Sequence, residues 1–134
     1  MTEVHGRIGS NTPVGTLQFT LFLPSVDREG SPIDQDRWVQ DALATFGTLF
    51  RGATAFPPGR GVWRDDARGG KLVYDDTVMI TSYVDPATVT DAALTQLRSF
   101  LHGMGRDARQ GEVGIVVGGQ YHGITQYDPP EAGA

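Results

Sequence analysis

VGTLQFTLFL, residues 14–23, is the stretch of sequence that decides the fold. Apolar and polar side chains alternate along it, and a period of two is typical of a strand with one buried face. The expected buried face consists of Leu17, Phe19, Leu21 and Leu23. The other face consists of Thr16, Gln18, Thr20 and Phe22. This second face is too apolar for plain solvent and too polar for a core, a mixture that commonly lines a ligand cavity or meets a second subunit.

Two amphipathic helices are expected, separated along the chain by further strands. Apolar residues recur at spacings of three and four over 38–50, and Asp34 is a good N-cap for this first helix. Thr90 can cap a second helix, whose apolar stripe includes Leu97 and Leu101. Strands are expected over 71–84 and 112–117, and Gly118-Gly119 can form a primed turn into a hairpin partner. We expect the core to contain Leu17, Phe19, Leu21, Leu43, Phe46, Val78, Ile80, Leu97, Leu101 and Ile115.

The expected order of elements is strand, helix, strand, strand, helix, strand, followed by a small extension. This order is the split βαβ arrangement of a ferredoxin-like α+β sandwich, with two helices on one face of a mainly antiparallel sheet. A chain of 134 residues, 39% of them hydrophobic, fits one domain. We expect a flexible arm over 1–13, a single domain over 14–126 that ends in a short hairpin, and a flexible tail over 127–134.

Composition excludes several classes of function. The chain has no cysteine, so disulfides, thiolate metal sites and cysteine nucleophiles are excluded. No apolar leader or membrane-length run is present, which predicts a cytoplasmic protein without a membrane partner. Residues 51–71 hold five basic and two acidic residues, a local charge of +3 that leaves −8 for the rest of a chain of net charge −5. Nucleic acid is therefore an unlikely partner, because duplex binding needs a broad basic face.

GATAFPPGRGVWRDDARGGK, residues 52–71, is where we expect a site. A loop so rich in glycine and proline is costly to order and poor at filling a core, which favours a functional role. A short strand is expected inside it, around 53–56 or 61–63. We expect Trp63 to be at least half buried and to anchor the loop. The candidate ligand-binding residues are Arg60, Trp63, Arg64, Asp65, Tyr83, Glu112 and His122.

The main functional hypothesis is a binding or interaction module, a homodimer, that recognises an anionic small molecule or a partner segment through this loop. A small enzyme is the alternative: His122, Glu112 or Asp65 would carry a proton, and an arginine would clamp an anionic substrate. Asp27 follows the first strand and suggests a metal-dependent phosphodiesterase as a further alternative. The sequence predicts no metal site and no cofactor. Whether the protein is an enzyme is left open, and Arg64 has a competing use as the partner of nearby aspartates.

One family resemblance involves both helix and loop. The chain resembles a family of small bacterial proteins of unknown function in the order of four features. These are the helix with Trp38, then Gly52-Ala53-Thr54, the Gly61-Val62-Trp63-Arg64 element and the Asp75-Asp76 pair. The resemblance covers residues 14–117 and implies a ferredoxin-like fold, but it implies no activity. This chain departs from the pattern at the acidic pair, where the family has one glutamate.

Overall fold

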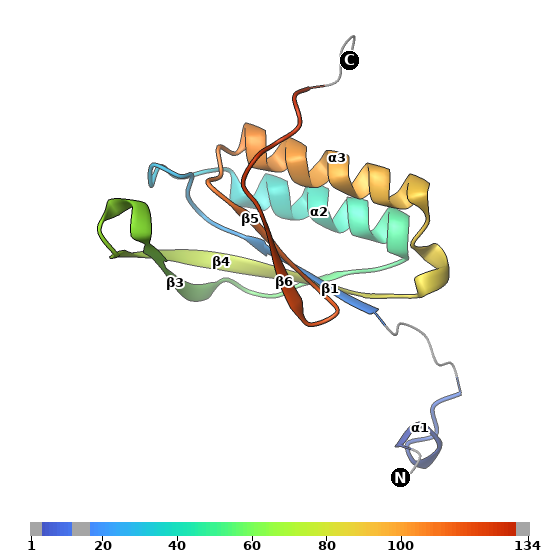
Figure 1. Cartoon of the computed structure of the whole chain (residues 1–134). Helices are drawn as coiled ribbons and strands as arrows, with labels where there is room; N and C mark the ends of the chain where they lie inside the picture. The colour runs from blue at the N-terminus through green and yellow to red at the C-terminus, as the bar shows by residue number, and fades with distance from the viewer. Residues whose placement is uncertain (1–3, 12–16, 131–134) are drawn as a thin grey trace.

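The computed structural model describes residues 4–11 and 17–130, and within them two long helices lie on one face of a sheet (Figure 1). The helices are α1 (Val4–Arg7), α2 (Gln35–Phe50) and α3 (Asp91–Asp107). The strands are β1 (Leu17–Leu23), β2 (Thr54–Ala55), β3 (Gly59–Asp65), β4 (Lys71–Val84), β5 (Val113–Val117) and β6 (Gln120–Ile124). Short 3-10 turns occupy Asp66–Arg68 and Pro86–Thr88.

The sheet is antiparallel throughout and has the strand order β2-β4-β1-β5-β6, with β3 also paired to β4. The first and central strand, β1, lies between the strands that precede and follow α3. This is the split βαβ arrangement, and β6 adds the short C-terminal hairpin. The predicted ferredoxin-like α+β fold is confirmed.

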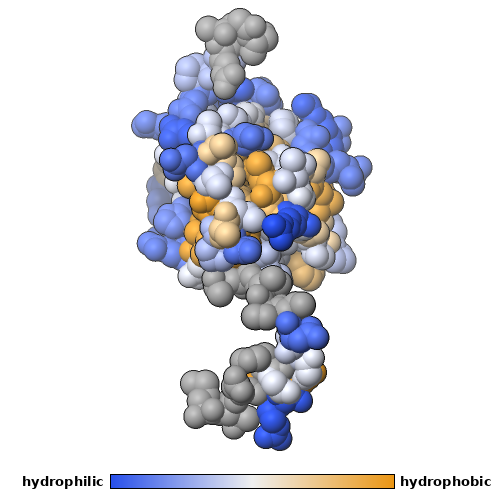
Figure 2. Space-filling model, turned by 90° about the vertical axis from the view of Figure 1, so that its right-hand side faces the viewer, coloured by the Kyte–Doolittle hydropathy of each residue, from blue (hydrophilic) through white to orange (hydrophobic). Residues whose placement is uncertain are grey.

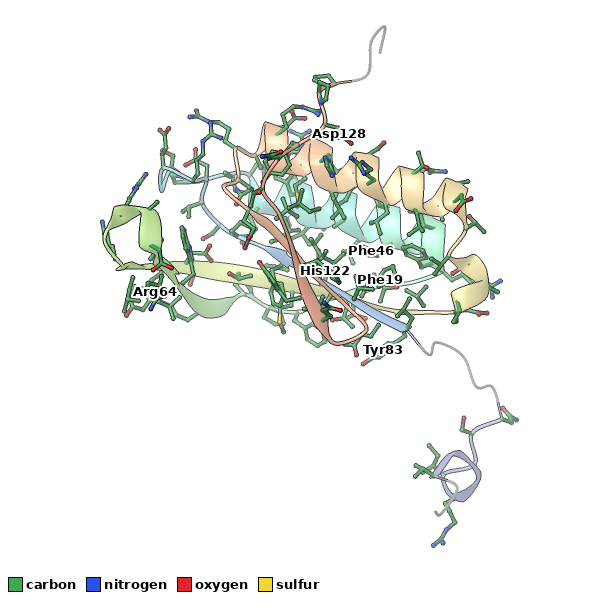
Figure 3. The ribbon with its side chains drawn as sticks, in the orientation of Figure 1. Phe19, Phe46, Arg64, Tyr83, His122 and Asp128 are labelled. Atoms are coloured by element: carbon green, nitrogen blue, oxygen red, sulfur yellow. The ribbon has the colours of Figure 1, made fainter. Side chains whose placement is uncertain are left out.

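The core lies between the sheet and the two helices. Figure 3 shows Phe19 of β1 and Phe46 of α2 in this layer. Phe19 packs edge-on against Phe50, with ring centroids 5.2 Å apart, a favourable geometry for aromatic pairs. The predicted core is confirmed, with Leu17 and Leu43 packed at its margin. Figure 2 looks at the end of the molecule away from the β3–β4 hairpin and shows apolar residues at the surface, surrounded by hydrophilic ones.

The predicted N-caps of the two long helices and the predicted glycine turn are present in the structure. Asp34 accepts a hydrogen bond from the Arg37 amide, and Thr90 caps α3 through a bond from the Ala93 amide. Gly118 and Gly119 have φ values of 58° and 87°, the positive values that a primed hairpin turn requires. No helix of the described residues is long and apolar enough to cross a membrane.

Residues 52–71 are mostly a hairpin and not a loop. The 14 residues of β4 extend well past the seven of β1, which pairs with β4 only from Val78 onward. The free half of β4 needs another partner for its backbone groups. β3 supplies it, from Gly59 opposite Thr77 to Asp65 opposite Lys71. The projecting hairpin leaves Trp63 51% exposed, so the expectation that Trp63 anchors a loop is wrong.

The segment after β6 returns along α3 instead of leaving the domain. The Tyr127 hydroxyl donates a 2.8 Å hydrogen bond to the Gln110 carbonyl, and its ring covers Gly105. Arg98 binds Asp128 through Nε and Nη2, at 2.7 and 2.9 Å. His102 is buried, and its Nδ1 accepts a hydrogen bond from the Asp128 amide. Of the tail expected over 127–134, residues 131–134 lie outside the described residues, as do residues 1–3 and 12–16 of the N-terminal side.

Candidate functional site

A groove of about 400 Å³ opens on the face of the sheet that the helices leave uncovered. It begins at β1, crosses β4 and continues along β3. Its volume lies within the range of small-ligand pockets. The lining residues are Phe22, Pro57, Gly59, Arg60, Gly61, Val62, Trp63, Asp75, Thr77 and Met79.

Two glycines of β3 account for the hollow. Gly59 pairs with Thr77 and Gly61 with Asp75, and paired residues of neighbouring strands share a face. Without side chains on this face, β3 leaves open space between Trp63 and the start of the strand. A Cβ at position 61 would lie 3.3 Å from the Thr77 hydroxyl oxygen. The glycines therefore keep the floor of the groove accessible.

Asp75 and Thr77 are the polar groups on this floor. Both are half-buried, and the Thr77 hydroxyl donates a 2.6 Å hydrogen bond to Asp75 Oδ1. This bond fixes the direction of the carboxylate and occupies one of its acceptor positions. The groove thus combines apolar walls with a single oriented carboxylate.

A second carboxylate lies beside the groove on the same face. The Tyr121 hydroxyl donates a 2.7 Å hydrogen bond to Glu112 Oε2. Tyr121 also packs next to Phe22, at a ring-centroid distance of 6.3 Å. Partial burial of Tyr121, followed by the hydrogen bond and charge of Glu112, raises its pKa to about 12. Tyr121 is therefore a neutral hydrogen-bond donor at physiological pH.

The middle of the uncovered face links these two regions. Phe22 and Met79 are paired across β1 and β4, and the hydroxyls of Thr20 and Thr81 lie 3.1 Å apart in the next row. Tyr83 is on this face too, opposite Gln18, and it is 69% exposed. In Figure 3, Tyr83 lies at the side of the sheet away from the helices. The mixed face expected from the sequence is thus continuous with the groove.

The structure separates the other candidate residues. Arg60 and Trp63 line the groove, whereas Arg64 binds Asp66 through Nε at 2.6 Å near the tip of the hairpin. Asp65 forms an ion pair with Arg68, at 3.5 Å. The competing use of Arg64, as the partner of a nearby aspartate, is confirmed.

His122 lies on the other side of β6 from Tyr121. It pairs with Ile115, whose side chain is in the core, and successive residues of a strand face opposite sides. Figure 3 shows His122 far from Arg64. The two residues therefore do not share a site.

Asp27, the candidate metal ligand of a phosphodiesterase, has a structural role. Its Oδ1 accepts hydrogen bonds from the amides of Glu29 and Ser31, which closes the turn after β1. These bonds lower the pKa of the Asp27 carboxyl group. Among the described residues, no group of three or more histidine and acidic side chains is placed to hold a metal ion.

Sequence reasoning missed four residues of this region as site residues: Phe22, Asp75, Thr77 and Tyr121. The sequence predicts only that Phe22 lies on the mixed face, and Asp75 enters only through the resemblance, as one of an acidic pair. A usable signal was available in the spacing Gly59-x-Gly61, because glycines at alternate positions of a strand empty one face. This spacing indicates a hollow only once residues 59–65 are known to form a strand.

Comparison with known proteins finds similarity in structure only. No family model and no curated protein matches the chain, so the resemblance to the bacterial family of unknown function is not confirmed. A phage SAM lyase in complex with S-methyl-5′-thioadenosine is similar, with a TM-score of 0.64 at 18% identity over 87% of this chain and 95% of the lyase. A phage SAM lyase in the apo state gives a TM-score of 0.57 at 20% identity, over 87% and 94% of the two chains.

This finding overturns the main functional hypothesis. Two solved structures that resemble the chain over nearly their whole length are phage SAM lyases, which are enzymes. A binding or interaction module that recognises an anion is therefore the wrong expectation, and the enzyme alternative is favoured. Of the two arginines expected to bind an anion, Arg64 is engaged by Asp66, and Arg60 lines a groove that has Asp75 on its floor.

Proposed function

We propose that this protein is a small enzyme that binds S-adenosylmethionine (SAM) on the uncovered sheet face and cleaves it, releasing S-methyl-5′-thioadenosine. The observation that carries the proposal is the groove, an apolar hollow with an oriented carboxylate at its floor. The likeness to the phage SAM lyases supports the choice of substrate. SAM is a cation at its sulfonium centre, so acidic and aromatic groups suit it better than an arginine clamp.

The groove fits the nucleoside part of this substrate. Phe22 and Trp63 offer flat apolar surfaces at its two ends, and Gly59 and Gly61 leave room for a planar base between them. Asp75 lies on the floor with acceptor positions still open after the bond from Thr77. A carboxylate of this kind binds ribose hydroxyls in nucleotide-binding proteins, and we assign the same role to Asp75.

The reaction breaks the bond between the sulfonium sulfur and the four-carbon amino-acid portion. The substrate's own carboxylate attacks the carbon bound to sulfur, and the new carbon–oxygen bond closes a lactone of the amino-acid portion. The electron pair of the broken carbon–sulfur bond moves to sulfur, which becomes the neutral thioether of S-methyl-5′-thioadenosine. The positive charge on sulfur disappears as the bond breaks, so carboxylates that hold the ground state too tightly would slow the step. The protein's contribution is then to orient the substrate and to exclude water from an apolar groove.

The test is to incubate the purified protein with SAM and to separate the products by chromatography. Release of S-methyl-5′-thioadenosine at a rate proportional to protein concentration is expected. Calorimetry should show binding of the same thioether to the free protein. The matched control is Arg64→Ala, at an exposed position outside the groove lining, which should leave both results unchanged. A protein that neither binds the thioether nor releases it contradicts the proposal.

A further inference from the structure

Glu112 and Tyr121 form a preorganised pair that the nucleoside site does not use. Glu112 immediately precedes β5, and Tyr121 lies in β6. Within the described residues, Glu112 has one hydrogen-bond partner, Tyr121, and no basic side chain forms an ion pair with it. Oε2 accepts the bond from Tyr121, and Glu112 is exposed. The carboxylate is therefore held in place and still able to accept from a ligand.

Two glycines make room for this pair. A Cβ at Gly114 would lie 2.5 Å from the Tyr121 hydroxyl oxygen, and a Cβ at Gly123 would collide with the Glu112 carboxylate. These glycines are partners across β5 and β6. The phenol thus lies flat over one strand and the carboxylate over the other. Each needs a position without a side chain, so the arrangement depends on four residues together.

The pair is continuous with the groove. Phe22 lines the groove and also packs against Tyr121. Gly114, over which the Tyr121 ring lies, pairs with Phe22 across β5 and β1. The Tyr121 ring is therefore directly beside a residue that lines the groove. A ligand that extends past Phe22 would reach the Glu112 carboxylate next.

We infer that Glu112, positioned by Tyr121, binds the α-ammonium group of the substrate's amino-acid portion. The inference rests on the proposed function, because it assigns the part of SAM that the nucleoside groove leaves outside. An ammonium group has three donors, and a carboxylate beside an apolar ring forms strong charge-assisted bonds with it. Glu112 would thus select substrates that carry the amino acid over the thioether product, which lacks it.

The experiment compares two neutral-sulfur ligands by calorimetry. S-adenosylhomocysteine carries the ammonium group and has no sulfonium charge, whereas S-methyl-5′-thioadenosine lacks the amino acid altogether. Glu112→Gln should weaken binding of S-adenosylhomocysteine about 10-fold or more, which corresponds to the loss of a hydrogen bond to a charged group. Binding of S-methyl-5′-thioadenosine should change by less than about twofold, within the usual range for a surface substitution away from the ligand.

Two further variants guard against a merely structural effect. Gly123→Ala should reproduce the selective loss, because the added methyl group displaces the Glu112 carboxylate. The matched control, Gly47→Ala, has open space around the added atom and should leave both affinities unchanged. An equal loss for both ligands, or no loss for either, overturns the inference and leaves the proposed function standing. A parent protein that binds neither ligand overturns the proposed function and, with it, the inference.

Discussion

The Thr77 hydroxyl donates to Oδ1 of Asp75, two residues earlier on the same strand, at 2.6 Å. If this carboxylate binds ribose hydroxyls, Asp75→Asn should weaken binding of S-methyl-5′-thioadenosine about tenfold, because a charged acceptor is replaced by a neutral group. Calorimetric titration measures the change. Asp76→Asn is the matched control, since the neighbouring residue points to the other face of β4. Equal affinities for all three proteins would contradict the assignment.

Tyr121 should ionise at unusually high pH. Its pKa is raised to about 12, first by burial and then by Glu112, and the unfolded chain has an ordinary tyrosine. The native state therefore holds the proton more tightly. Its stabilising effect should be complete below about pH 10 and should be lost as the pH rises toward about 12. Ultraviolet titration of tyrosinate in the parent and in Glu112→Gln measures this, and the variant should titrate at lower pH.

Leu101 should contribute strongly to stability. It is 5% exposed in the core, so Leu101→Ala should lower the free energy of unfolding by about 2–5 kcal/mol. Leu94 provides the control on the same helix, because it is 43% exposed and its truncation removes few contacts. Urea denaturation of both variants gives the comparison. Similar midpoints for the two would show that the buried stripe of α3 is misassigned.

Two glycines of α3 should respond to alanine with opposite signs. Gly103→Ala meets nothing closer than 3.8 Å and should stabilise the protein by about 0.5–1 kcal/mol, because alanine favours helices. Gly105→Ala collides with the Tyr127 ring and should destabilise it by about 1–3 kcal/mol. Thermal unfolding measured for each variant tests the pair. Stabilisation by both substitutions would mean that Tyr127 does not pack on α3.

We propose that a second copy of the chain packs on the uncovered face at Tyr83, beside the groove. Tyr83 lies outside the groove lining and is 69% exposed. The segment 51–71 carries +3 against −8 elsewhere, so a hairpin of one copy complements the body of another. Sedimentation velocity at micromolar concentration should find an oligomer that weakens at high salt. A monomer at every concentration and salt level contradicts the proposal.

The sequence predicted the fold where a strong local pattern and the final packing agree. The alternation of apolar residues along β1 and their spacing in α2 and α3 predict which side of each element is buried. Thr90 predicts where α3 begins. Residues 59–65 gave no such pattern, because glycines replace the side chains that would reveal a period of two. Their strand structure depends on the length of β4, a tertiary feature.

The candidate site was predictable as a surface and not as a set of contacts. Glu112 and Tyr121 are nine residues apart, and only the register of the β5–β6 hairpin brings them together. The sequence predicts the turn at Gly118-Gly119. It does not predict that Gly114 and Gly123 leave the space in which the Tyr121 and Glu112 side chains lie. For Arg64 the sequence favours a contact that the structure does not form. Its charge suggests an anionic ligand, but its guanidinium group binds the nearby Asp66.

The docking of Tyr127 and Asp128 onto α3 has a practical consequence for handling the protein. Asp128 lies at α3, on the side of the helices away from the uncovered sheet face (Figure 3). A dye, affinity tag or surface tether joined at this end would extend into solvent behind the helical layer. A molecule immobilised in this way presents its groove to the solution, so binding kinetics can be recorded on a sensor surface without blocking the ligand's approach.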